Sequence, residues 1–140
     1  WYEVSNWARS DQARCRHNLL YWTGADWWGL GPGAHSHVGG VRWWNVKHPS
    51  AYAQRLAAGA SPGLAREVLT VDEAHMEDVM LRLRLASGLP LAVLDAAGRA
   101  GAERALAGGL LAADEYAAGR AVLTVRGRLL ADAVVRDLLP

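Results

Sequence analysis

The amino-acid sequence predicts an α+β protein of two regions. Short strands and glycine-rich turns occupy residues 1–59, and a mainly helical, winged-helix-like region occupies 70–140, with a linker at 60–69. All seven tryptophans lie in the first 44 residues, whereas helix-capping patterns and apolar helical periodicity begin at residue 70. Charge divides near the same point. Residues 1–71 hold seven Lys/Arg and four Asp/Glu, a net charge of +3, and residues 72–140 hold eight and ten, a net charge of −2.

The first region predicts extended segments between flexible turns. Within residues 1–8, alternation places Tyr2 and Glu3 on opposite sides of a strand. Pro49 suits the first turn of a helix, and Gly59 suits the position just after its end. The expected elements are a strand at 1–8, a polar loop at 9–16, a short strand at 27–30, an extended segment at 37–44 and a helix at 48–59.

The second region predicts helices with recognisable ends. Thr70 and Glu73 form the pattern of a capping box, in which each side chain bonds the other residue's amide. Thr124 is placed to cap the closing helix, in which Leu130, Val134 and Leu138 share one face. The expected elements are a helix from 70 that stops at Gly88, a helix from Pro90 to Gly98, a helix at about 102–111, two short strands around a turn at 110–125, and the closing helix.

The composition excludes several classes of protein. The chain has 51% hydrophobic and 21% charged residues, which is typical of a folded globular protein. No apolar run approaches the roughly 18 residues of a membrane span and no signal peptide opens the sequence, so a cytoplasmic protein without a transmembrane segment is expected. The sequence begins at Trp1, which indicates a processed or incomplete chain. Cys15 is the single cysteine, so a disulfide framework is excluded.

Five blocks of the sequence, taken in order, resemble a known family. They are YEVSNWA, RHNLLYW, GLGPGAHS, GGVRWWNVKHPSAY and LTVRGRLLADAVVRDLL. Together they resemble the C-terminal part of the HemW-type haem chaperones, which are related to oxygen-independent coproporphyrinogen III oxidase among the radical S-adenosylmethionine proteins. The resemblance covers nearly the whole chain. It implies that residues 1–59 are the last strands of a partial (β/α) radical-SAM barrel and that 70–140 are the helical C-terminal domain.

The resemblance also implies a function and its site residues. The family binds haem and passes it to apo-haemoproteins, and its full-length members bind S-adenosylmethionine and a [4Fe-4S] cluster held by three cysteines. That cysteine motif is missing from this chain, so the chain is expected to be inactive in radical chemistry alone. The haem-associated motif HNxxYW corresponds to His17, Asn18, Tyr21 and Trp22, with His17 as the candidate ligand of the haem iron. The family's glycine block, near S-adenosylmethionine or substrate, corresponds to Gly29, Gly31, Gly33, Ala34, His35 and Ser36.

The residues alone leave two interpretations of RHNLLYW open. An imidazole beside aromatic side chains suits the iron and the flat face of a porphyrin. Alternatively, Asn18 caps a short helix while Tyr21 and Trp22 pack in the core. The resemblance favours the first interpretation, with Asn18 bonding nearby backbone and Arg16 meeting a propionate. Within the same family, oxidative decarboxylation of coproporphyrinogen III is the alternative activity.

Other candidate sites are weaker. His35 and His37 face the same side of a strand, but a third metal ligand at a suitable spacing is not evident. The pairs Trp27–Trp28 and Trp43–Trp44 are each expected to place one ring inward and one outward, toward a missing barrel neighbour. A winged-helix outline also raises nucleic-acid binding, but the net charge of −2 in the second region argues against a nucleic-acid partner.

Overall fold

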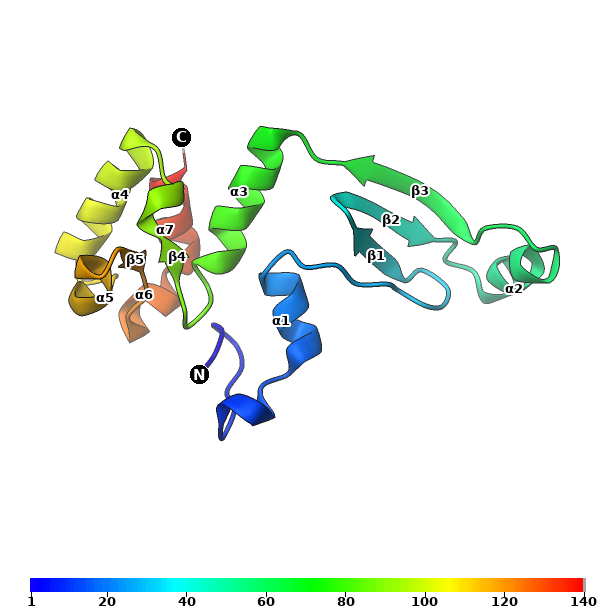
Figure 1. Ribbon diagram of the computed structural model, residues 1–140, viewed down its shortest axis with the longest axis horizontal. Helices are drawn as coiled ribbons and strands as arrows, with labels where there is room; N and C mark the ends of the chain where they lie inside the picture. The colour runs from blue at the N-terminus through cyan, green and yellow to red at the C-terminus, as the bar shows by residue number, and fades with distance from the viewer. Residues whose placement is uncertain (140) are drawn as a thin grey trace. The chain divides into compact units, whose positions relative to one another are not determined.

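The computed structural model describes residues 1–139 and contains helices and small antiparallel sheets (Figure 1). The chain folds as two compact units. Trp1–Thr23 and the chain from Ala74 onward form the first unit, and Gly24–Glu73 form the second. The α+β class predicted from the sequence is confirmed. Among residues 1–139, none of the helices combines the length and the apolar character that a membrane span requires.

The first unit begins with a tight turn, so the strand predicted at 1–8 is wrong. The amide of Tyr2 donates to the carbonyl of Asn6 (3.1 Å), which folds the segment back on itself. Tyr2 and Glu3 are both buried, at 4% and 0% exposure, although strand alternation would place them on opposite sides. A single bridge between Glu3 and Leu85 is formed in place of a continuous ladder, and in it the amide of Ala86 donates to the carbonyl of Tyr2 (2.9 Å).

The capping box at the start of helix α3 (Val71–Arg82) is confirmed. The amide and hydroxyl of Thr70 each donate to the Glu73 carboxylate at 2.8 Å, and the amide of Glu73 donates back to the Thr70 hydroxyl at 3.3 Å. These bonds from Thr70, with a smaller contribution from Arg42, lower the pKa of Glu73 below its ordinary value of 4.5 against a small opposing effect of desolvation. The helix ends earlier than predicted, and Gly88 closes the following turn with a φ of 65°.

The helix predicted from Pro90 to Gly98 is wrong. Pro90 belongs instead to the short strand β4 (Leu89–Pro90), which leads into the 3₁₀ turn η2 (Leu91–Val93). Helix α4 (Ala96–Ala107) then starts at Asp95, whose carboxylate accepts from the amide of Gly98 (2.7 Å). Gly98 therefore lies inside a helix, and tight packing explains why this position is occupied by glycine. A Cβ atom at Gly98 would lie 2.7 Å from the carbonyl oxygen of Leu138.

The two strands predicted at 110–125 are reduced to a single antiparallel bridge between Leu111 and Leu123. The amide of Ala112 donates to the carbonyl of Val122 and the amide of Thr124 to the carbonyl of Leu110, both at 2.9 Å. Helix α5 (Ala113–Ala117) occupies the middle of this segment, and strand β5 (Arg120–Ala121) pairs antiparallel with β4. The order of three helices, a hairpin and a helix that suggested a winged helix is therefore not found in the described chain. Thr124 caps a helix as predicted, because its hydroxyl accepts from the amide of Gly127 (3.0 Å). That helix is the short α6 (Val125–Leu129), however, and the closing helix begins after it, at Ala131, without a side-chain cap.

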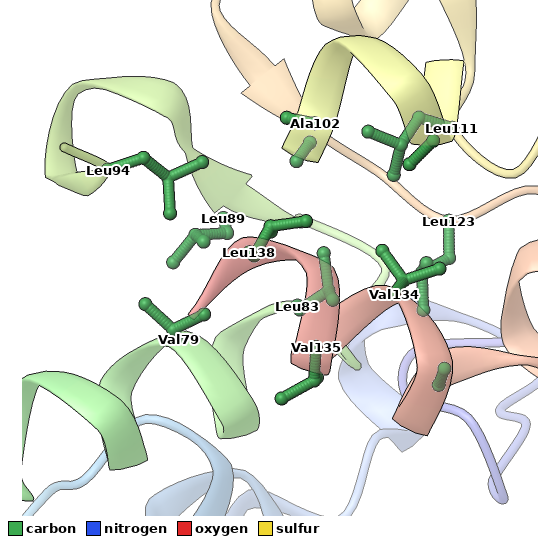
Figure 2. Close-up of a cluster of buried hydrophobic side chains, with 13 residues drawn as sticks. Val79, Leu83, Leu89, Leu94, Ala102, Leu111, Leu123, Val134, Val135 and Leu138 are labelled. Carbon is green, nitrogen blue, oxygen red and sulfur yellow. The ribbon is translucent and has the colours of Figure 1, made fainter. Parts of the chain in front are cut away.

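Helix α7 (Ala131–Leu138) supplies the centre of the first unit's core (Figure 2). Val134 and Leu138 are buried as predicted, whereas Leu130 precedes the helix and is 43% exposed. The cluster draws on α3, β4, α4 and α7, and its members are Val79, Leu83, Leu89, Leu94, Ala102, Ala105, Leu111, Ala121, Leu123, Ala131, Val134, Val135 and Leu138. Burial of these side chains is the main stabilising contribution to the unit.

The second unit is a three-stranded antiparallel sheet in the order β1-β2-β3, with helix α2 between β2 and β3 (Figure 1). The single extended segment predicted at 37–44 is instead two antiparallel strands joined by a turn at Gly39 and Gly40, whereas the predicted helix at 48–59 is α2. Strand β3 lies within residues 60–69, the segment predicted to be a linker. The short strand predicted at 27–30 is not formed, and Trp27 makes a single bridge to His37 instead. The bounds are β1 His35–Val38, β2 Val41–Asn45, α2 Pro49–Ala57 and β3 Gly63–Val68.

Candidate functional site

The RHNLLYW segment forms the short helix α1 (Arg16–Trp22) in the first unit. It follows the 3₁₀ turn η1 (Asp11–Ala13), and Cys15, an exposed free thiol, occupies the position before the first helical residue. The alternative in which Asn18 caps the helix is therefore wrong, because Asn18 lies inside it. The helix ends at Thr23, whose hydroxyl donates to the carbonyl of Leu19 (2.8 Å).

His17 and Tyr21 form a pair on the surface of α1. They are four residues apart, which brings their side chains together on one face of a helix. The Tyr21 hydroxyl lies 2.8 Å from Nε2 of His17, and the rings meet edge to face at a centroid distance of 4.9 Å and an angle of 80°. Both residues are exposed, with Tyr21 at 39%. The imidazole is therefore accessible, and the position of its outer nitrogen is determined by the phenol.

Asn18 links α1 to the buried N-terminal turn. Its side-chain amide donates to the Glu3 carboxylate (3.4 Å) and to the Tyr2 hydroxyl (3.5 Å). Glu3 is fully buried and also accepts from the amide of Ser5 (3.0 Å) and from the side chain of Asn6. A buried carboxylate is costly unless several donors surround it, so this network holds the helix in place. The expectation that Asn18 bonds nearby backbone is wrong, because its partners are side chains.

The remaining motif residues differ in exposure. Trp22 is half-buried at the end of α1, and Arg16 is exposed at its start. Arg16, His17 and Tyr21 thus offer a cation, an imidazole and a phenol to solvent, while Asn18 connects the helix to the N-terminal turn. Sequence reasoning missed Glu3, although an acidic residue inside an apolar N-terminal segment is the signal that could have found it.

The glycine block lies in the second unit, where its first glycine packs against strand β1. A Cβ atom at Gly29 would lie 1.9 Å from the carbonyl oxygen of His35, so only glycine permits this approach. The amide of Gly29 donates to the hydroxyl of Ser36 (2.9 Å), which is fully buried. The structure therefore brings together Gly29, His35 and Ser36 of the predicted site. The contacts of Gly29 with the other two residues hold the loop in position.

Two side chains from outside the block hold the rest of the loop. Asn45 is buried, and its amide group donates to the carbonyl of Gly31 (3.0 Å). The Tyr52 hydroxyl, from α2, accepts from the amide of Gly31 (3.2 Å), and the amide of Gly33 donates to the carbonyl of Val46 (2.9 Å). Gly31 has a φ of 109°, which side chains rarely allow. Asn45 and Tyr52 were missed in the sequence because their partners lie 14 and 21 residues away.

These bonds determine what the glycine block can offer a ligand. The amides of Gly29, Gly31 and Gly33 are bonded within the unit, and so is the amide of Ala34, which donates to the carbonyl of Gly31 (3.3 Å). Such a loop contributes shape and carbonyl groups more than amide donors. The exposed imidazole of His35 stacks on Trp44 at a centroid distance of 5.7 Å and is the block's accessible polar side chain.

The two strand histidines have separate surroundings. The ring of His37 lies against the ring of Trp27 at a centroid distance of 5.0 Å, and its Nδ1 is 3.2 Å from the carbonyl oxygen of Ala25. Within residues 1–139, no group of three or more His, Cys, Asp or Glu side chains is arranged to hold a metal ion. An iron–sulfur cluster needs about four ligands, usually thiolates, and the single thiol of Cys15 does not fit that requirement.

The tryptophans border an open apolar groove in the second unit. Trp28 is 66% exposed and meets Trp43 edge to face at 4.9 Å. The groove has a volume of about 520 Å³, and Val41, Leu64 and Arg66 complete most of its lining. The expected outward ring is found at Trp28, whereas the other three tryptophans of the two pairs, Trp27, Trp43 and Trp44, are all half-buried.

Comparisons with known proteins agree on one family. Heme chaperone HemW of Mycobacterium tuberculosis (strain H37Rv) is 59% identical to this chain over 139 residues, which is 99% of the chain and 35% of that protein. Heme chaperone HemW of Bacillus subtilis is 34% identical over 88 residues, 63% of the chain and 23% of that protein. The chain thus spans about a third or less of the length of these relatives. No family model matches it.

A solved structure shows the same fold. It is coproporphyrinogen III oxidase (HemN) from Escherichia coli, described as a radical SAM enzyme, with a TM-score of 0.61 and 22% identity over 81% of this chain and 28% of that chain. At this level of identity the likeness concerns the fold alone. Together with the sequence relatives, it confirms the resemblance carried by the five blocks: the chain belongs to the HemW family and corresponds to the C-terminal part of its members.

Proposed function

We propose that this chain is the haem-contacting C-terminal part of a haem chaperone, in which His17, Asn18, Tyr21 and Trp22 form the haem site and the bound haem passes to apo-haemoproteins. The observation that carries the proposal is the exposed pair of His17 and Tyr21 on α1, with Nε2 and the hydroxyl 2.8 Å apart. Haem supplies an iron that accepts one axial nitrogen, and a neutral imidazole is a common donor. The name of the relatives, heme chaperone, supports the same function.

Each residue of the site has a role that its surroundings support. His17 donates a nitrogen lone pair to the iron, and Tyr21 and Trp22 supply aromatic surface for the macrocycle. Asn18 holds α1 on the buried Glu3 carboxylate, so the position of the imidazole follows from the network in the first unit. Arg16 is exposed at the start of the helix and suits a propionate group. An exposed helix face holds its ligand from one side, which favours transfer over storage.

The cluster and S-adenosylmethionine belong to the full-length protein in this proposal. There, residues 1–59 continue the barrel, residues 70–140 form the C-terminal domain, and Gly29, Gly31, Gly33, Ala34, His35 and Ser36 shape the wall near S-adenosylmethionine or substrate. The close bonding of this loop by Asn45 and Tyr52 supports a shaping role. We place the full-length protein in the cytoplasm.

Titration with ferric haem tests the proposal. Haem is added to the 140-residue chain and to a full-length version, and the Soret band is followed for wild type, His17→Ala and His75→Ala. His75 is an exposed histidine on α3 and serves as the matched control. We expect His17→Ala to shift or abolish the band with retained circular dichroism, and His75→Ala to leave it unchanged. An unaltered spectrum and affinity in His17→Ala would exclude His17 as the ligand, and His35 would be the next candidate.

Oxidative decarboxylation of coproporphyrinogen III is the alternative for the full-length protein. The fold shared with HemN favours it. This activity would require the cluster-bearing part of the protein, and α1 would then contact a porphyrinogen, which carries no iron. A full-length protein that decarboxylates coproporphyrinogen III, and in which His17→Ala leaves haem binding intact, would support this alternative over the chaperone.

A further inference from the structure

The hydroxyl of Tyr21 is hydrogen-bonded to Nε2 of His17, the ring nitrogen farther from the main chain. The hydroxyl lies 2.8 Å from Nε2, and the two rings are fixed edge to face. Among the described residues, His17 is the histidine whose Nε2 is hydrogen-bonded, whereas His37 and His48 use Nδ1. A ligand that approaches α1 from solvent therefore meets a hydrogen-bonded pair of side chains, because both members are exposed.

The hydrogen bond between Tyr21 and His17 affects which imidazole nitrogen is able to bind iron. A neutral imidazole has one nitrogen that accepts and one that bears a proton. Nδ1 of His17 lies next to the ring carbon attached to the side-chain stem, so a broad flat macrocycle centred on Nδ1 would collide with the helix backbone. Nε2 points away from the main chain, and it is the nitrogen that such a macrocycle reaches. When the Tyr21 hydroxyl donates to Nε2, the lone pair that iron needs is already in use.

We propose that the hydroxyl of Tyr21 competes with haem iron for Nε2 of His17, which lowers haem affinity and speeds release to an acceptor. This inference rests on the proposed function, in which His17 meets the iron. Dissociation governs most differences in affinity among related complexes, so a built-in competitor acts mainly on the rate of release. Tyr21 is therefore a positioning residue that acts through His17, and the iron ligand itself is unchanged.

The opposite arrangement makes an opposite prediction. If Nε2–H donated to the Tyr21 oxygen while Nδ1 held the iron, the phenol would orient the ligand and strengthen binding, as outer partners of metal-bound histidines do. Tyr21→Phe separates the two cases, because it removes the hydroxyl and keeps the ring. Competition predicts tighter binding in this variant, and support predicts weaker binding.

The first experiment measures affinity and release with ferric haem on the 140-residue chain. We expect Tyr21→Phe to bind about fivefold more tightly and to lose haem to excess apomyoglobin more slowly by a similar factor, since it removes one hydrogen bond that competes with binding. The Soret position should match wild type. In the His17→Ala background, Tyr21→Phe should change the affinity little, because competition requires the imidazole. Unchanged or weaker binding, or a new ligand spectrum in Tyr21→Phe, would overturn the inference.

A second measurement needs no haem. Nitrogen NMR of the chain, at a pH where histidine is neutral, reports which ring nitrogen of His17 bears the proton. We expect Nε2 to be unprotonated and its resonance to move in Tyr21→Phe, and a protonated Nε2 would overturn the competition. The two proposals fail in different ways. A wild-type protein that binds no haem, either as the 140-residue chain or at full length, removes the proposed function and the competition with it. Haem binding without a gain in Tyr21→Phe removes only the competition.

Discussion

Replacement of Asn18 by alanine separates the scaffold of the haem motif from its chemistry. Asn18 donates to Glu3 at 3.4 Å and to Tyr2 at 3.5 Å, both longer than a typical hydrogen bond. Each bond is therefore at the lower end of the usual net contribution, and we expect a loss of about 1 kcal/mol in the free energy of unfolding. Glu3 keeps its bonds from Ser5 and Asn6, so the network loosens without collapsing.

Urea denaturation followed by circular dichroism measures this loss, and a haem titration measures the second half of the prediction. Asn18→Ala should bind haem with the wild-type Soret position, because the amide faces the scaffold. Asn18→Asp is the sharper companion variant. It places a second carboxylate beside the buried Glu3, so we expect a larger loss, of about 2–3 kcal/mol, from the repulsion between the two like charges. If Asn18→Ala altered the spectrum as strongly as His17→Ala without a loss of stability, the scaffold role would be refuted.

Two further predictions concern the frame of the fold. The pKa of Glu73 is below its ordinary value of 4.5, so the stability contributed by its charge is present above pH 4.5 and is lost as the pH falls through the lowered pKa. In urea unfolding, Glu73→Gln should therefore be less stable than wild type above pH 4.5, and the difference in the free energy of unfolding should narrow on acidification. A difference that stays constant with pH would refute a role for the charge in the bonds from Thr70. Gly101→Ala should destabilise the first unit by about 2 kcal/mol, because the clash of a Cβ atom 1.8 Å from the carbonyl oxygen of Asp137 outweighs a gain of about 1 kcal/mol in helix propensity. The control is Ala97→Gly at an exposed position of the same helix, which measures the propensity term with the opposite sign. A Gly101→Ala variant that is more stable than wild type in thermal unfolding would refute the packing argument.

Local patterns account for the parts of the fold that could be predicted. The capping bonds at Thr70 and Thr124 each join residues three apart in the chain. In such cases the partners are close in space once a helix forms, so spacing alone identifies them. The family could be recognised for a related reason, because the blocks that carry the resemblance are continuous segments such as RHNLLYW.

The errors occurred where a distant partner decides the local structure. Gly98 resembles a helix end, yet it lies inside α4, and it is a glycine because the carbonyl of Leu138 leaves no room for a side chain. The alternating residues 1–8 form a turn in which the Glu3 carboxylate accepts from Ser5 and Asn6, and Asn18 of α1 completes this set of donors. Chain separation, from 15 residues for Asn18 to 40 for Gly98, hides these contacts from any local pattern.

The sequence by itself determined the family, the α+β class and the segment that carries the candidate haem ligand. Only the tertiary structure decided what each residue of that segment does. Asn18 and His17 are adjacent in the chain, but successive helical residues point in different directions, so one meets the buried carboxylate of Glu3 and the other meets solvent and Tyr21. A burial difference between neighbours depends on what packs against the helix, and that is a property of the folded unit.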